Sequence, residues 1–176
     1  MLRGRLDRPR RLTSVWHYGP VDSRGRVADK LEIIEQLYRY AELIDSGDFD
    51  GVGQLLSRST FGGPASGSVS GAENIAKLFA MTTRRYPDHG NTPRTRHLVL
   101  NPVVELADDG TATTRSTFCV LQDTETVPIQ PIVVGRYYDT FGHDEDGWYF
   151  TERKVEIQMT GDVSAHLMVD PKAFER

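Results

Sequence analysis

The sequence predicts an α+β fold, a cone-shaped barrel in which three N-terminal helices pack on a strongly curved, mainly antiparallel sheet. Apolar residues recur every three or four positions in the first half of the chain, which is typical of amphipathic helices. After Pro87 the spacing changes to two, in four segments rich in Val, Ile, Thr, Tyr and Phe. Helices followed by an antiparallel meander belong to the α+β class. We expect a cavity between helices and sheet, where small molecules commonly bind.

Three helices are expected, over residues 31–44, 48–56 and 71–86. The inward face of the first helix is expected to carry Leu31, Ile34, Tyr38, Ala41 and Asp45. Asp48 is a suitable N-cap for the second helix. Residues 62–71 are dense in Gly and Ser, which predicts a loop or an irregular edge.

Four strands are expected, over residues 96–106, 112–122, 129–141 and 148–159. The turn sequence Asp-Asp-Gly joins the first two strands, and an acidic turn that ends in Gly joins the last two. Both pairs are therefore expected to be antiparallel hairpins.

The chain of 176 residues has the length of one domain. We expect this domain at residues 27–160, after an arginine-rich tail at 1–26 and before a C-terminal segment at 161–176. The formal net charge is −4 although the first twelve residues hold five arginines, so the domain itself is acidic. An acidic domain lacks the basic patch that binds phosphate groups, and nucleic acid is not an expected partner.

The composition also argues against several other kinds of site. The apolar runs are only a few residues long, whereas a membrane-spanning helix needs about 20. The single cysteine, Cys119, cannot form an internal disulfide, which favours a cytoplasmic protein. The histidines lack metal-ligand spacing, and residues 62–67 match neither a phosphate-binding loop nor a dinucleotide fingerprint. We expect neither a metal nor a cofactor.

Several polar residues occupy positions where the pattern predicts apolar side chains. Asp45 takes an inward position on the first helix, where it either pairs with a functional group or caps the following helix. His97 and Asn101 share one mixed face of the first strand, which is typical of a pocket lining or of a structural histidine. Arg153 lies on the apolar face of the last strand and needs either an anionic ligand or a carboxylate such as Asp139 or Asp45.

Five motifs resemble those of a known family, and they are YRYAELIDSGDFD (38–50), SGAENI (70–75), TRHLVLN (95–101), GRYYDTF (135–141) and WYFTER (148–153). Their order and spacing resemble the SnoaL-like branch of the nuclear transport factor 2-like superfamily over residues 27–160. The resemblance implies a cone of three helices on a bent sheet, which agrees with the fold expected from the periodicity.

By this resemblance, Asp45 and His97 fall where scytalone dehydratases and hexachlorocyclohexane dehydrochlorinases carry an aspartate–histidine pair. In those enzymes the histidine removes a proton and the aspartate orients it, while a leaving group departs from the neighbouring carbon. Arg153 matches an arginine of the dehydrochlorinases, and Tyr40 falls where they have a lysine. The missing lysine favours dehydration, isomerisation or the aldol-type cyclisation of polyketide cyclases over halide elimination.

The leading hypothesis is a cofactor-independent lyase or isomerase that uses Asp45 and His97 as a catalytic dyad on a small, largely apolar substrate. The expected substrate-binding residues are Tyr40, Asn101, Arg153, Tyr138 and Phe118. The alternatives are a non-catalytic ligand-binding or dimerisation module and an accessory subunit of an oxygenase. A homodimer or small homo-oligomer is expected, because one strand face carries Leu98, Leu100 and Val104.

Overall fold

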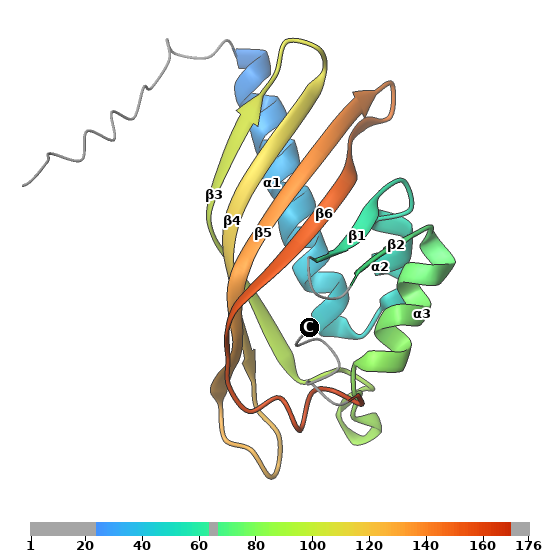
Figure 1. Ribbon diagram of the computed structural model, residues 1–176, viewed down its shortest axis with the longest axis vertical. Helices are drawn as coiled ribbons and strands as arrows, with labels where there is room; N and C mark the ends of the chain where they lie inside the picture. Colours follow the sequence, from blue (N-terminus) through green and yellow to red (C-terminus); the bar gives the residue numbers. More distant parts are fainter. Residues whose placement is uncertain (1–23, 64–66, 170–176) are drawn as a thin grey trace, which may run out of the picture.

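The computed structural model describes residues 24–63 and 67–169, and within them three α-helices pack on a six-stranded sheet (Figure 1). The helical elements are α1 (Arg24–Ser46), α2 (Phe49–Leu55), α3 (Ala72–Thr82) and the short 3-10 helix η1 (Pro87–His89). The strands are β1 (Thr60–Gly63), β2 (Gly67–Ser70), β3 (Thr95–Leu106), β4 (Thr111–Gln122), β5 (Gln130–Asp144) and β6 (Gly147–Thr160). None of the described helices is long and apolar enough to cross a membrane.

The strands form one mixed sheet in the order β2-β1-β6-β5-β4-β3. Neighbouring strands are antiparallel, except that β1 runs parallel to β6. Figure 1 shows the four long strands twisting across α1, with α2 and α3 beside the short strands. The α+β class and the curved, mainly antiparallel sheet are confirmed. The sheet is open at β2 and β3 rather than closed into a barrel.

Helix α1 begins at Arg24, inside the segment expected to be a tail, and the rest of that segment lies outside the described residues. The inward face expected for this helix was wrong at Leu31 and Tyr38, which are 57% and 47% exposed, and right at Ala41 and Asp45, which are buried. The other residues that α1 buries in the core are Ile33, Leu37, Tyr40 and Ile44. Because Ile33 and Ile34 are adjacent, the sequence is compatible with either of them pointing inward. Asp45 is buried against β3, where Thr95 and His97 donate hydrogen bonds to it.

Residues 62–71 were expected to form a loop or an irregular edge, because of their Gly and Ser content, and most of the described residues among them belong to the hairpin of β1 and β2 at one edge of the sheet. Backbone pairing with β6, rather than side-chain propensity, holds β1 in the sheet. A Cβ atom at Gly62 would lie 2.1 Å from the carbonyl oxygen of Gly67, so glycine lets the two strands approach closely. Phe61 anchors the hairpin in the core.

Strand β3 contains a bulge at Asn101, where φ is 52° and the register with β4 shifts between Leu100 and Val103. Beyond the bulge the alternation reverses, so Val104 is buried and Val103 is exposed. The expected face with His97 and Asn101 is therefore wrong, because Asn101 is exposed. The expected grouping of Leu100 with Val104 is wrong for the same reason.

The described segment that follows β6, residues 161–169, returns toward the end of α3 (Figure 1). The carbonyl of His166 accepts a hydrogen bond from the backbone N–H of Arg84 at 2.8 Å. The N–H of Met168 donates to the carbonyl of Thr82 at 2.9 Å. Residues 161–168 are thus tied to the end of α3, where they form one wall of a cavity.

Candidate functional site

An apolar cavity of about 320 Å³ lies between the inner face of the sheet, helices α1 and α3 and the C-terminal segment. Small-molecule sites range from about 300 to 1,000 Å³, so this cavity suits one small molecule. Its apolar wall includes Phe61, Leu78, Phe79, Phe118, Val155 and Leu167. Its polar side chains include Tyr40, His97, Tyr137 and His166. A mainly apolar wall with a few polar groups is typical of sites that orient a small ligand.

Asp45 and His97 form a close pair, of which His97 lines this cavity. Oδ1 of Asp45 lies 2.6 Å from Nδ1 of His97 and accepts a hydrogen bond from the Thr95 hydroxyl at 2.7 Å. Oδ2 accepts the backbone N–H of His97 at 2.7 Å. The side chains of Asp45 and His97 are only 10% and 9% exposed. Three short hydrogen bonds therefore fix the carboxylate, and the carboxylate fixes the imidazole.

The sequence around this pair explains its position. Gly47, with φ of 77°, follows Ser46, the last residue of α1, so Asp45 lies in the final turn of the helix. Asp48 caps α2 by accepting a hydrogen bond from the N–H of Gly51 at 2.8 Å, so Asp45 is not the cap of the following helix. Strand β3 is at the edge of the sheet, and Asp45 supplies the acceptor that the backbone N–H of His97 would otherwise lack.

The electrostatics of the pair set the tautomer of the imidazole. Burial favours the neutral acid at Asp45, but the hydrogen bonds and charge of His97 outweigh it and lower the pKa of Asp45. Asp45 is therefore ionised at neutral pH and only accepts hydrogen bonds. Nδ1 of His97 must carry the shared proton, which leaves Nε2 unprotonated in the neutral ring. Nε2 lies on the far side of the ring from Asp45, and His97 lines the cavity.

Two of the residues expected to bind substrate line the cavity. The rings of Tyr40 and His97 meet edge to face, with centroids 6.4 Å apart. Phe118 is buried and stacks on Tyr137, with centroids 4.3 Å apart. Helix α1 and strands β3, β4 and β5 thus bring aromatic rings together around the dyad.

Arg153 is fully buried but does not belong to the cavity wall. Its Nη1 lies 3.6 Å from Oδ2 of Asp139, and its guanidinium carbon lies 3.9 Å and 4.1 Å from the ring centroids of Tyr137 and Tyr40. Burial raises the pKa of Asp139 to about 6, although Arg153 opposes the shift. Both groups are thus mainly charged at pH 7. Of the two partners expected for Arg153, an anionic ligand or a carboxylate, the structure shows the ion pair with Asp139. The guanidinium of this pair also packs on the rings of Tyr40 and Tyr137, which line the cavity.

Asn101 and Tyr138 do not reach the cavity. Asn101 is exposed at the bulge of β3. Tyr138 is 38% exposed and lies on the face of β5 opposite to Tyr137. Consecutive strand residues point to opposite sides of the sheet. The sequence alone did not indicate whether Tyr137 or Tyr138 points inward.

His166 is the main cavity residue that the sequence did not indicate. It belongs to the segment after β6, where no helical or strand period identifies an inward position. Burial, together with the charge of His97, lowers the pKa of His166 to about 4. Two histidines therefore share the cavity, and they differ in their environment, because the Asp45 carboxylate is bonded to His97.

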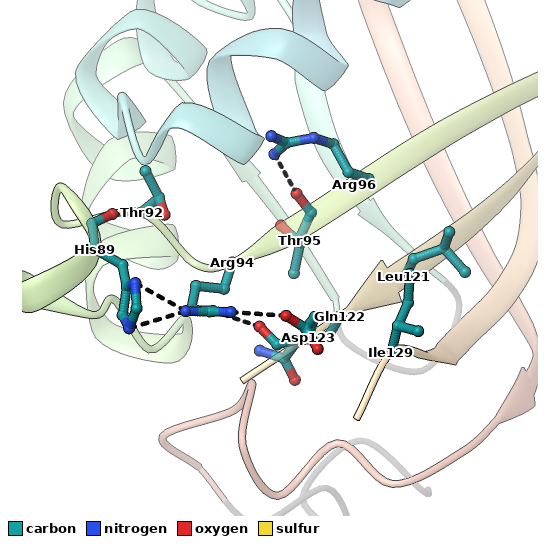
Figure 2. Close-up of a pocket in the computed structure, with 9 residues that line it drawn as sticks. All are labelled: His89, Thr92, Arg94, Thr95, Arg96, Leu121, Gln122, Asp123 and Ile129. Carbon is teal, nitrogen blue, oxygen red and sulfur yellow. Dashed lines mark hydrogen bonds and ion pairs between the residues drawn. The ribbon is translucent and has the colours of Figure 1, made fainter. Parts of the chain in front are cut away.

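A second hollow, of about 320 Å³, lies near the start of β3 and the end of β4, and Figure 2 shows the side chains that line it. Its cations are already satisfied within the protein. Arg94 donates to the carboxylate of Asp123 at 2.7 Å and contacts the ring of His89, while Arg96 donates to the carbonyl of Thr95 at 2.7 Å. In the part of the chain that the structure describes, no three His, Cys, Asp or Glu side chains gather as a metal site requires. The cavity at the dyad is the better candidate site.

Three helices on an open curved sheet, with a carboxylate–histidine pair whose histidine lines an apolar cavity, define a cone-shaped α+β domain with a candidate small-molecule site. Residues 25–154 match the family model described as the SnoaL-like domain, and the chain belongs to this family. Among curated proteins, no sequence gives a significant match.

Solved structures share this fold. A nuclear transport factor 2-like protein with a cystatin-like fold from Novosphingobium aromaticivorans is 21% identical, with 83% of this chain and 96% of that chain covered and a TM-score of 0.62. A candidate scytalone dehydratase from the same species is 18% identical, with 78% and 89% covered and a TM-score of 0.62. ActVI-ORFA from Streptomyces coelicolor is 18% identical, with 73% and 96% covered and a TM-score of 0.60. At these identities the likeness establishes the fold.

Proposed function

We propose that the protein is a lyase or isomerase that removes a proton from a carbon atom next to a carbonyl group in a small, largely apolar substrate. One observation carries the proposal. Nδ1 of His97 lies 2.6 Å from Oδ1 of Asp45, so that Nε2 is left free on a ring that lines an apolar cavity. Histidine is the commonest general base, and a positioned base contributes about 10²- to 10⁴-fold to the rate.

The reaction begins when Nε2 of His97 takes the α-proton and the electron pair of the C–H bond moves onto the carbonyl oxygen as an enolate forms. Asp45 stabilises the imidazolium through the Nδ1–H hydrogen bond. In an isomerisation, His97 returns the proton to a different carbon atom. In a dehydration, a hydroxyl group leaves the β-carbon and takes the proton as water. Either course balances without an oxidant or a reductant.

Tyr40 and Tyr137 are the candidates to stabilise the enolate oxygen. Burial raises the pKa of both hydroxyls, that of Tyr137 to about 12, so both remain protonated donors at neutral pH. Hydrogen bonds to a developing charge are stronger in an apolar cavity than in water. Arg153 stacks on both rings and places a positive charge behind them.

The relatives support the same class of reaction. One neighbour in fold bears the name of a dehydratase. The family resemblance places an aspartate–histidine pair of dehydratases at Asp45 and His97, and these two side chains are hydrogen-bonded in the structure. The shared fold alone would also suit a non-catalytic binding protein.

The test is the exchange of α-hydrogen for deuterium in 2-tetralone and cyclohexanone, followed by proton NMR in D₂O. We expect the wild-type protein to accelerate the exchange of at least one ketone well above the buffer rate. His97→Gln should reduce the acceleration by about 10²- to 10⁴-fold. His143→Gln is the matched control, because His143 is exposed on β5 and outside the cavity wall. Binding of the ketones without any exchange would favour a binding protein instead.

A further inference from the structure

His166 presents a second imidazole to the cavity, from the opposite end of the chain to Asp45. The segment that carries it is well tied to the domain. The carbonyl of Ala165 accepts the Tyr86 hydroxyl at 2.6 Å, and the N–H of His166 donates to the carbonyl of Val163 at 2.9 Å. His166 and Leu167 both line the cavity. The backbone that carries the imidazole is therefore held in place at the wall.

The ring of His166 has an unused capacity for hydrogen bonding. Its Nδ1 is buried and has no hydrogen-bond partner among the residues that the structure describes. Buried polar atoms are nearly always paired, so the bare Nδ1 shows that this edge of the ring is not held by a hydrogen bond to any described residue, and a ligand oxygen would meet the part of the ring that lines the cavity. The surrounding wall is mainly apolar and offers few alternatives.

His166 differs from His97 in its surroundings, because Asp45 is bonded to His97. Burial and the charge of His97 lower the pKa of His166 to about 4, so its ring is neutral at pH 7. A neutral imidazole brings no positive charge to balance a carboxylate buried in this apolar cavity, but it donates to a carbonyl oxygen or exchanges hydrogen bonds with a hydroxyl group. A neutral histidine can polarise a carbonyl group without transferring a proton to it.

We propose that His166 is a specificity-determining residue whose imidazole binds an uncharged carbonyl or hydroxyl oxygen of the ligand at the C-terminal wall of the cavity. The ligand class is thus a small, uncharged ketone or hydroxyketone with an apolar body. This assignment deepens the proposed function and rests on it for the identity of the site, where His97 acts on carbon and His166 holds oxygen.

The test compares 2-tetralone with tetralin, which has the same ring system without the carbonyl group. Dissociation constants are measured by ligand-observed NMR for the wild-type protein, for His166→Leu and for the control His143→Leu. One neutral hydrogen bond corresponds to about three- to tenfold in affinity. We expect His166→Leu to reduce the preference for ketone over hydrocarbon by this factor, and the control to leave the preference unchanged. A change of less than twofold in His166→Leu would overturn the proposal.

Two further measurements complete the test. In the wild-type protein, the ¹⁵N resonances of the His166 ring should shift with 2-tetralone and remain in place with tetralin, a result that requires no substitution to fold. Tetralin-2-carboxylate should bind at least tenfold more weakly than 2-tetralone, and equal or tighter binding would contradict an uncharged ligand. If His166→Leu lowers the ketone preference while no protein exchanges α-protons, the proposed reaction fails and the role of His166 stands. If exchange occurs and the preference is unchanged, the reverse holds.

Discussion

The substitution Asp45→Asn separates the chemistry of the dyad from its structural role. Asparagine keeps one oxygen. The backbone N–H of His97, 2.7 Å from Oδ2, can only donate a hydrogen bond, so the amide oxygen must stay at the Oδ2 position. The amide NH₂ group therefore takes the position of Oδ1, which lies 2.6 Å from Nδ1 of His97. Nδ1 must then accept a hydrogen bond, so the ring proton moves to Nε2. With its proton on Nε2, His97 is no longer a base toward the cavity.

The magnitudes follow from the three hydrogen bonds of Asp45. Each of the three bonds loses its charged partner, which weakens it by about 1 kcal/mol, so the upper limit for the loss of stability is about 3 kcal/mol. The carboxylate no longer has to be buried, which offsets part of that loss. The loss of the general base should lower the rate of α-deuteration by about 10²- to 10⁴-fold.

The assay is deuterium exchange of the ketone that the wild-type protein turns over, with urea unfolding of the same preparations to measure stability. Asp48→Asn is the matched control, because Asp48 caps α2 and asparagine is also a good N-cap. We expect the control to exchange at the wild-type rate. A folded Asp45→Asn protein that exchanges within threefold of the wild-type rate would refute the assigned tautomer.

Three other results are expected. Arg153→Met should lower the free energy of unfolding by about 3–5 kcal/mol, because Asp139 is left unpaired, and adding Asp139→Leu should restore most of it; urea titration of both variants checks this. His166 should titrate near pH 4 by NMR, below its ordinary pKa. Between pH 6.5 and 4, the histidine is therefore protonated in the unfolded state and neutral in the folded state, so a fall in pH favours unfolding. Wild-type stability should therefore fall by up to about 3 kcal/mol more than that of His166→Leu between pH 6.5 and 4, and a midpoint near 6.5 would contradict this. We also propose a homodimer through the outer sheet face, where Leu98 and Leu100 are about two-fifths exposed; light scattering should give twice the chain mass at micromolar concentration, and a monomer would contradict it.

The long periodic segments made the fold predictable. Strands of twelve or more residues with strong alternation and recognisable turns fixed most of the sheet, and these became β3 to β6. The β1–β2 hairpin was missed because its pairing depends on β6, a partner far away in the sequence. The inward face of α1 was wrong at Leu31 and Tyr38 because Ile33 and Ile34 are adjacent apolar residues, of which Ile33 alone is fully buried.

The candidate site was predictable where polar residues broke an apolar pattern. Asp45 and His97 stood out in this way, and the family resemblance connected them across 52 positions. Asn101 was misplaced because a bulge inserts one residue into the alternation without a signal of its own. His166 was missed because its segment has no regular period, and only the tertiary contacts with the end of α3 place it against the cavity.

The most direct test of the account is a crystal structure of the wild-type protein with 2-tetralone bound. The account predicts that the ketone occupies the cavity beside His97, with an α-carbon about 3–3.5 Å from Nε2, the separation expected of reacting atoms. A ketone bound on the outer face of the sheet, or one whose α-carbons all point away from His97, would contradict it.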